Sequence, residues 1–395
     1  MQPMHGQVLL LASAQALFQT ASVLVATIGS LAGSHLAPSP AWATAPVAVM
    51  FLGTATATVP ASLLMARAGR RVGFVTGAGL GTVGGLVAAT GVFTSSMLLL
   101  CLGTLLVGAY QGFAQFYRFA ASEVADSAFK PRAISLVLAG GVVAALAGPA
   151  LARIGGDLLQ PTYTASFLIL AVVSLVAVGV LLGVNVPPPL EADATHAPAR
   201  PLGEIVRQPT YLVALFGAVT GYGIMILAMT ATPLAMEHEN LGLGDTALVI
   251  QLHVLGMFLP SFFTGSLIAR FGVLQVMFTG IALLTGHVML SLSGTGIYSF
   301  SSALVFLGVG WNFLYVGGTN LLTTAYAPAE RGKAQATNDL TIFLVGLAAS
   351  LSAGVLQSTV GWQTMNLLLL PWLALAAAAI LWLGLSNRRQ SVAGV

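Results

Sequence analysis

The chain has 395 residues, of which 57% are hydrophobic and only 6% are charged. Soluble proteins carry about 25% charged residues, so this composition excludes a water-soluble globular protein and indicates an integral membrane protein. The formal net charge is +3, and the sequence has no basic patch mixed with aromatic residues, so we expect no nucleic-acid partner. The single cysteine, Cys101, excludes an intrachain disulfide and a cysteine-based metal cluster.

Apolar stretches follow one another along the chain, each long enough to cross a hydrocarbon core of about 30 Å. We count twelve, near residues 7–33, 41–66, 73–94, 97–121, 132–155, 162–185, 209–236, 245–269, 273–293, 297–325, 334–357 and 363–386. The sequence therefore predicts an all-α integral membrane protein with twelve transmembrane helices. A polar, proline-rich segment divides them, so we predict an N-terminal six-helix bundle (1–186), a cytoplasmic linker (187–208) and a C-terminal six-helix bundle (209–395).

The cationic residues predict the orientation in the membrane. Nearly all Lys and Arg residues fall in the loops after the predicted helices 2, 4, 6, 8 and 10, or at the C-terminus. Since cytoplasmic loops carry an excess of Lys and Arg, we expect both termini to be cytoplasmic.

Two short sequence similarities relate the two halves of the chain. Residues 62–69 and 265–272 share an Ala-Arg-x-Gly core, and Pro131-Arg132-Ala133 corresponds to Gly332-Lys333-Ala334. Parallel six-helix repeats are typical of the major facilitator architecture, which has a central cavity between halves that rock in alternating access.

The loop after the second predicted helix resembles the signature of the major facilitator superfamily, Gly-x-x-x-Asp-Arg-x-Gly-Arg. The residues that match are Arg67, Gly69, Arg70 and Arg71, whereas Ser62 and Ala66 replace the Gly and Asp. The resemblance covers essentially the whole chain and implies the major facilitator fold. The missing carboxylate puts the usual charge relay of this loop in doubt.

Four soft ligands form two pairs in the predicted helices 7 and 8. Met225 and Met229 are spaced i, i+4, as are His253 and Met257, so each pair lies on one helix face. At 1.5 Å per residue both pairs lie roughly 10–18 Å below the outer surface. Thioethers and an imidazole suit Cu(I), although methionine is also an ordinary apolar filler of membrane helices.

This paired motif resembles the signature of the CcoA-type copper importers, or CalT group, a branch of the major facilitators. The resemblance implies import of a copper ion or small copper complex across the bacterial cell inner membrane, for assembly of cbb3-type cytochrome oxidase. It implies Met225, Met229, His253 and Met257 as ligands. Copper would be the transported substrate, and no prosthetic group is expected. The protein is expected to be a monomer in the lipid bilayer, with a cytoplasmic copper chaperone as a candidate partner. The chain lacks the further cysteines of that group.

Other polar residues are candidates for the cavity and its gate. Helices 1, 4 and 10 carry candidate lining residues that either bind an organic solute or cross-link helices: Gln15, Gln19, Tyr110, Gln111, Gln115, Tyr117, Trp311, Asn312 and Tyr315. The charged residues Arg67, Arg70, Arg71, Arg118 and Asp339 are predicted to brace a cytoplasmic gate, a role favoured over proton coupling. His287 is predicted to be structural. Met236–Glu239 is interpreted as a polar outer loop in preference to a cation-capturing one.

No phosphate-binding loop or catalytic motif is present, so we expect a secondary transporter and not an enzyme. The alternative to copper is a small organic solute or drug. The protein would then be an importer or an exporter of that solute, and a proton-coupled antiporter is one such type. The Gln, Tyr and Trp residues would then form the site and the methionines would only line it. An alternative of another class is a membrane receptor or assembly scaffold for an oxidase.

Overall fold

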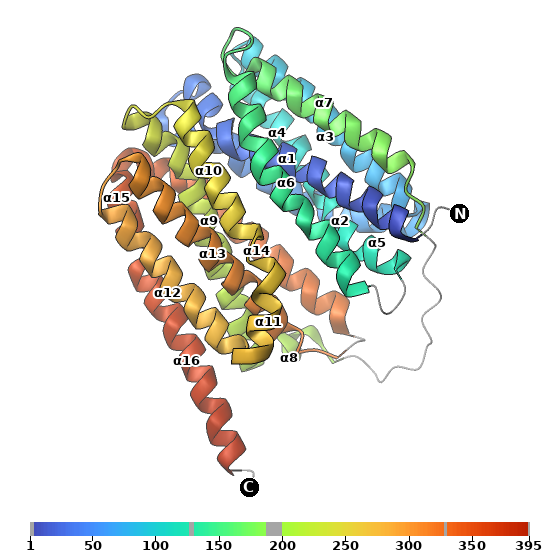
Figure 1. Ribbon diagram of the computed structural model, residues 1–395, viewed down its shortest axis with the longest axis vertical. Helices are drawn as coiled ribbons and strands as arrows, with labels where there is room; N and C mark the ends of the chain where they lie inside the picture. Colours follow the sequence, from blue (N-terminus) through green and yellow to red (C-terminus); the bar gives the residue numbers. More distant parts are fainter. Residues whose placement is uncertain (1–3, 126–129, 187–199, 328–329, 394–395) are drawn as a thin grey trace.

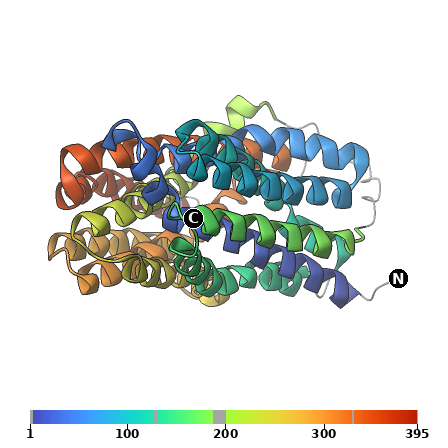
Figure 2. The same ribbon diagram turned by 90° about the horizontal axis from the view of Figure 1, so that it is seen from above.

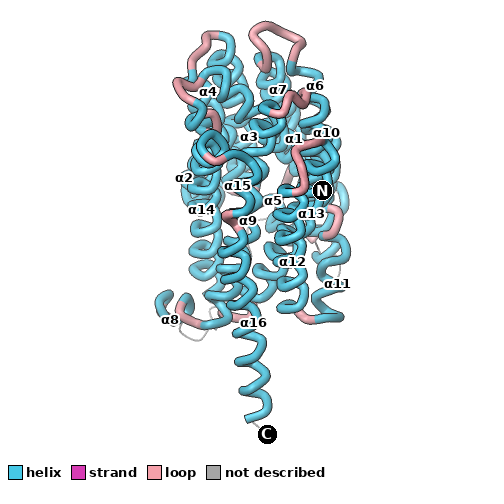
Figure 3. Tube along the Cα trace, turned by 90° about the vertical axis from the view of Figure 1, so that its left-hand side faces the viewer, coloured by secondary structure: helices cyan, strands magenta, loops and turns pink. Residues whose placement is uncertain are grey.

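The computed structural model describes residues 4–125, 130–186, 200–327 and 330–393, which form helices and loops without any strand (Figures 1 and 3). The elements are α1 (Met4–Leu36), the short 3-10 helix η1 (Pro40–Trp42), α2 (Ala45–Ala68), α3 (Arg70–Phe93), α4 (Met97–Ala114), α5 (Tyr117–Val124), α6 (Lys130–Gly156), α7 (Thr164–Leu182), α8 (Leu202–Val206), α9 (Pro209–His238), α10 (Leu243–Phe258), α11 (Ser261–Phe271), α12 (Val273–Leu292), α13 (Ile297–Leu322), α14 (Arg331–Thr359), α15 (Gly361–Leu367) and α16 (Leu370–Ala393).

The predicted membrane spans agree with these helices. In the described part of the chain, eleven helices are long and apolar enough to cross a membrane, and the bent pair α10–α11 passes the same test together, which gives twelve spans when the pair is counted as one. Large apolar side chains such as Leu9, Phe93 and Leu98 are exposed on the outside, as expected for contact with lipid. The all-α, twelve-span prediction is therefore confirmed.

Three spans that the sequence predicts as single helices are interrupted. The segment 97–121 divides into α4 and α5, and 363–386 divides into α15 and α16. The segment 245–269 divides into α10 and α11, which meet at an angle of 41°. Pro260 lies at this break, and its ring removes the N–H that would continue the helix.

The helices form two bundles, one from α1–α7 and one from α9–α16, which lie side by side when seen from above (Figure 2). The repeat predicted from residues 62–69 and 265–272 has a matching backbone. Gly69 and Gly272 each link two helices of their bundle and share φ values of 86° and 88°. Only glycine adopts this left-handed conformation without strain. The predicted linker lies outside the described residues over 187–199, and its remainder contains α8.

The two bundles converge at one end and diverge toward the end where both termini lie (Figure 1). Contacts between bundles gather at the converging end, which we call the closed end. There the Thr44 hydroxyl donates to the Ser350 carbonyl oxygen at 2.8 Å, and His35 lies 3.6 Å from Glu237. A Cβ on Gly354 would lie 2.7 Å from the Ala41 carbonyl oxygen. The space between the bundles therefore widens toward the termini.

Candidate functional site: a cavity between the two bundles

A cavity of about 470 Å³ lies between the bundles. It falls in the range of about 300–1,000 Å³ that small-molecule sites occupy. Helices α1, α2 and α4 of the first bundle and α9, α10, α13 and α14 of the second contribute its walls. A solute bound there would contact both halves of the molecule.

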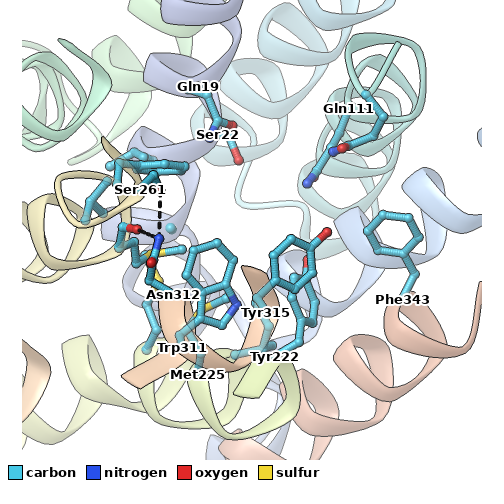
Figure 4. Close-up of a pocket in the computed structure, with 18 of the residues that line it drawn as sticks. Gln19, Ser22, Gln111, Tyr222, Met225, Ser261, Trp311, Asn312, Tyr315 and Phe343 are labelled. Atoms are coloured by element: carbon cyan, nitrogen blue, oxygen red, sulfur yellow. Dashed lines mark hydrogen bonds between the residues drawn. The ribbon is translucent and has the colours of Figure 1, made fainter. Parts of the chain in front are cut away.

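The wall from the second bundle is aromatic. Trp311 and Tyr315 are one helical turn apart on α13, and their rings stack with centroids 4.9 Å apart and planes at 13°. Phe258 meets Trp311 edge-on at 6.2 Å, and Tyr222 lies 6.1 Å from Tyr315. Phe343 extends the row through an edge-on contact with Tyr222. These rings form a row of π faces and edges along one side of the cavity (Figure 4).

The wall from the first bundle carries amides and a hydroxyl. Gln15, Gln19 and Ser22 of α1, and Gln111 and Gln115 in and just after α4, line the cavity. Figure 4 shows Gln19, Ser22 and Gln111 on the side opposite Trp311 and Tyr315. The Thr54 hydroxyl donates to Gln111 Oε1 at 3.2 Å, which orients that amide. The cavity therefore offers stacking surfaces on one side and hydrogen-bonding groups on the other.

The four predicted metal ligands fall into two groups. Met225, Met229 and Met257 all line the cavity and are at most 8% exposed. His253 is fully buried beside α13, where its Nδ1 lies 2.9 Å from the Leu304 carbonyl oxygen. A carbonyl only accepts, so Nδ1 carries the proton and Nε2 holds the lone pair. His253 Nε2 is buried with no hydrogen-bond partner among the described residues.

Asn312 is fully buried at the bend between α10 and α11. Its Nδ2 donates to the Met257 carbonyl oxygen at 2.8 Å and to Ser261 Oγ at 2.7 Å. The Thr264 hydroxyl donates to Asn312 Oδ1 at 2.7 Å. Asn312 therefore both lines the cavity, as the sequence predicts, and holds the broken span in place.

The predicted gate residues separate into pairs and exposed side chains. Arg118 lines the cavity and interacts electrostatically with Asp339 of the other bundle. Arg70 forms a 2.6 Å ion pair with Glu123 inside the first bundle. Arg67 and Arg71 are exposed.

A charge pair that the sequence analysis missed lies near the same end. Arg200 and Glu330 are 2.7 Å apart, and Glu330 also accepts from the backbone N–H groups of Ala327 and Arg200. These bonds, the one from Arg200 foremost, lower the pKa of Glu330 to about 2.

Several expectations from the sequence need correction. Tyr110 and Tyr117 do not line the cavity: both are fully buried inside the first bundle, where Tyr110 packs edge-on against Phe18 and Tyr117 against Phe74. Met236–Glu239 is largely not a loop, because α9 extends to His238.

His287 is fully buried, with Nδ1 2.9 Å from the Ala303 carbonyl oxygen and Nε2 2.9 Å from Asn366 Oδ1. These contacts connect α12 to α13 and α15, an arrangement that suits the structural role predicted for it. At the N-terminus, Met4 and His5 begin α1, and residues 1–3 lie outside the described part. Cys101 is half-buried on α4.

Residues 9–257 and 214–394 match the Major Facilitator Superfamily. The chain therefore belongs to this superfamily, and it is a multi-pass membrane protein of the secondary-transporter class. It is 41% identical over 376 residues to the riboflavin transporter RfnT of Brucella anthropi, covering 95% of this chain and 94% of that one. It is also 30% identical over 364 residues to the uncharacterized MFS-type transporter YdeG of Bacillus subtilis, covering 87% and 83%.

Solved structures share the fold at low sequence identity. A mutant of the nucleoside transporter NupG superposes with a TM-score of 0.71 at 13% identity, covering 94% of this chain and 99% of that one. A bacterial homologue of the lysosomal transporter Spinster, in an inward-facing and occupied conformation, also gives 0.71, at 15% identity and 95% coverage of both chains. The major facilitator fold predicted from the sequence is confirmed.

Proposed function

We propose that this protein carries a small, planar heteroaromatic solute of the flavin class across the membrane by alternating access, with riboflavin as the first candidate. The observation that carries the proposal is the stacked Trp311–Tyr315 pair facing the amides of Gln19 and Gln111 across one cavity. A fused, flat ring system with carbonyl and N–H groups on its edge needs both surfaces together: π faces to stack on and amides to hydrogen-bond its rim. The similarity to a riboflavin transporter supports the same class.

Binding of riboflavin to the purified protein tests this proposal directly, because stacking on Trp or Tyr quenches flavin fluorescence. We expect saturable quenching, and we expect Trp311→Ala to weaken binding by about tenfold, or ~1.4 kcal/mol. Trp382→Ala is the matched control, since Trp382 is 55% exposed on α16, away from the cavity. Growth of a riboflavin auxotroph on limiting riboflavin tests transport. Absence of both binding and growth support would reject the proposal.

Copper import is the second candidate. The observation in its favour is that three thioethers, those of Met225, Met229 and Met257, line the cavity, and that His253 Nε2 is a buried nitrogen with a free lone pair. Against it, His253 itself does not line the cavity. Radioactive copper uptake by cells expressing Met229→Leu or His253→Ala tests the ligand set. Uptake that exceeds that of vector-only cells and falls in both variants would support copper; wild-type uptake in both would exclude this site.

We further propose that the protein lies in a bacterial inner membrane with both termini in the cytoplasm. The excess of Lys and Arg in the loops at the termini-bearing end supports this orientation. The bundles would then diverge toward the cytoplasm, and the closed end would face outward. Labelling of single cysteines introduced into the loops at each end, in intact cells and in inverted vesicles, tests the orientation.

A further inference from the structure

The charge of the cavity determines which form of a flavin it accepts. Among the described residues that line it, Arg118 is the only charged side chain. It follows Gln111 and Gln115 at roughly helical spacing, at the end of the cavity nearer the termini. Thr319 and Asn320 of α13, and Thr323 just after it, also line this end, which we call the mouth. An isolated guanidinium there would attract anions, because charges interact strongly where water is partly excluded.

The opposite bundle supplies a carboxyl group, that of Asp339, which interacts electrostatically with Arg118. Asp339 lies one helical turn before Phe343 on α14, so the two side chains share a helix face. Phe343 lines the cavity, whereas Asp339, one turn away, does not itself line it. Asp339 interacts electrostatically with Arg118, and also with Tyr222 and Tyr315 of the aromatic wall. Asn338 Nδ2 donates to Asp339 Oδ1 at 3.1 Å, which helps to orient the carboxylate.

We propose that Asp339 is a specificity-determining residue: by neutralising Arg118 across the mouth, it makes the cavity select an uncharged flavin and reject its phosphorylated form. A phosphate monoester carries about −1.5 to −2 charges at pH 7. Beside the Arg118–Asp339 pair it would meet the carboxylate as well as the guanidinium, and it would lose much of its hydration. Riboflavin has hydroxyls in place of that phosphate and escapes this penalty. The inference rests on the proposed flavin function.

Affinities of riboflavin and flavin mononucleotide, measured by flavin fluorescence quenching on purified full-length protein, test the proposal. The wild type is expected to bind riboflavin at least tenfold more tightly. Asp339→Asn removes the negative charge and should lower this ratio by about tenfold, which corresponds to ~1.4 kcal/mol. Arg118→Gln should raise the ratio, and the double variant Arg118→Gln/Asp339→Asn should return it toward the wild-type value. Glu330→Gln is the matched control, since this carboxylate pairs with Arg200 outside the cavity lining.

The outcomes separate this inference from the proposed function. Unchanged ratios in Asp339→Asn and in Arg118→Gln, with riboflavin binding retained, would overturn the inference and leave the flavin function in place. If Asp339→Asn does not fold, an unchanged or lowered ratio in Arg118→Gln alone overturns it. If the wild type binds riboflavin and flavin mononucleotide equally, the cavity is not charge-selective and the inference is wrong. If the wild type binds neither, the proposed function fails and the inference fails with it.

Discussion

Replacement of Asn312 by leucine should loosen the bend between α10 and α11. Asn312 makes three side-chain hydrogen bonds, to the Met257 carbonyl oxygen, to Ser261 and from Thr264. Leucine has a similar size and removes all three. Between membrane helices a hydrogen bond contributes ~0.6 kcal/mol on average, and in proteins generally up to ~1.5 kcal/mol. We therefore expect Asn312→Leu to lower the free energy of unfolding by about 2–4 kcal/mol.

The position of the bend links this loss of stability to the cavity. Met257 and Ser261 lie on either side of the break, and both line the cavity. A looser bend would spread their positions, so solute affinity should fall together with stability. Denaturation of the purified protein by titration with a harsh detergent measures the first effect, and flavin binding measures the second.

The matched control for this experiment is Asn320→Leu. Asn320 lies on the same helix but is exposed at the mouth of the cavity. The same chemical change there should leave the unfolding free energy within about 0.5 kcal/mol of the wild type. Equal stability of the Asn312→Leu and Asn320→Leu variants would refute the view that Asn312 holds the bend.

Three further predictions concern parts of the fold away from the cavity. His287→Leu should lower the unfolding free energy by about 1–3 kcal/mol without weakening solute binding, since His287 connects α12 to α13 and α15. Gly354→Ala should push the closed end apart. A cysteine introduced at Thr44 in a Cys101→Ser background should then be labelled faster, whereas Gly179→Ala, with open space around its Cβ, should leave the labelling rate unchanged. The Arg200–Glu330 pair should stabilise the fold fully above pH 4.5, and this stabilisation should be lost as the pH falls toward about 2, because the pKa of Glu330 is depressed in the folded state. Over this pH range the melting temperature of Glu330→Gln should therefore fall less than that of the wild type.

The membrane spans could be predicted from the sequence because length and apolarity are local properties. The breaks at Gln115–Phe116 and Leu259–Pro260 were missed, although Pro260 is a local signal for the second. The Asn312 contacts that hold this bend come from another helix, so the local sequence does not show them. The lining was harder to assign. Gln111 lines the cavity, whereas its neighbour Tyr110 is turned into the bundle, about 100° around the same helix. Composition alone does not choose between two adjacent polar residues.

The pairing of distant residues was the least predictable property. Arg200 and Glu330 are 130 positions apart, and nothing local in either segment indicates their contact. Conversely, the repeated Ala-Arg-x-Gly core was informative because it reflects a backbone requirement. Gly69 and Gly272 need the same left-handed conformation, so the sequence keeps glycine at both positions.

The methionine motif and the aromatic wall occupy one cavity, so copper and flavin compete as interpretations of the same space. The i, i+4 spacing predicted that His253 and Met257 share one helix face. Four residues turn a helix by about 400°, so the two side chains differ in direction by about 40°, and His253 lies against α13. The three methionines remain, and Met225 lines the same cavity as Trp311 (Figure 4). A methionine thioether in this cavity can contact a flat aromatic ring as well as bind a metal, since sulfur packs favourably against aromatic faces and edges. Leucine keeps the apolar bulk and removes the sulfur, so Met229→Leu separates the interpretations: a flavin carrier tolerates it and a copper carrier does not.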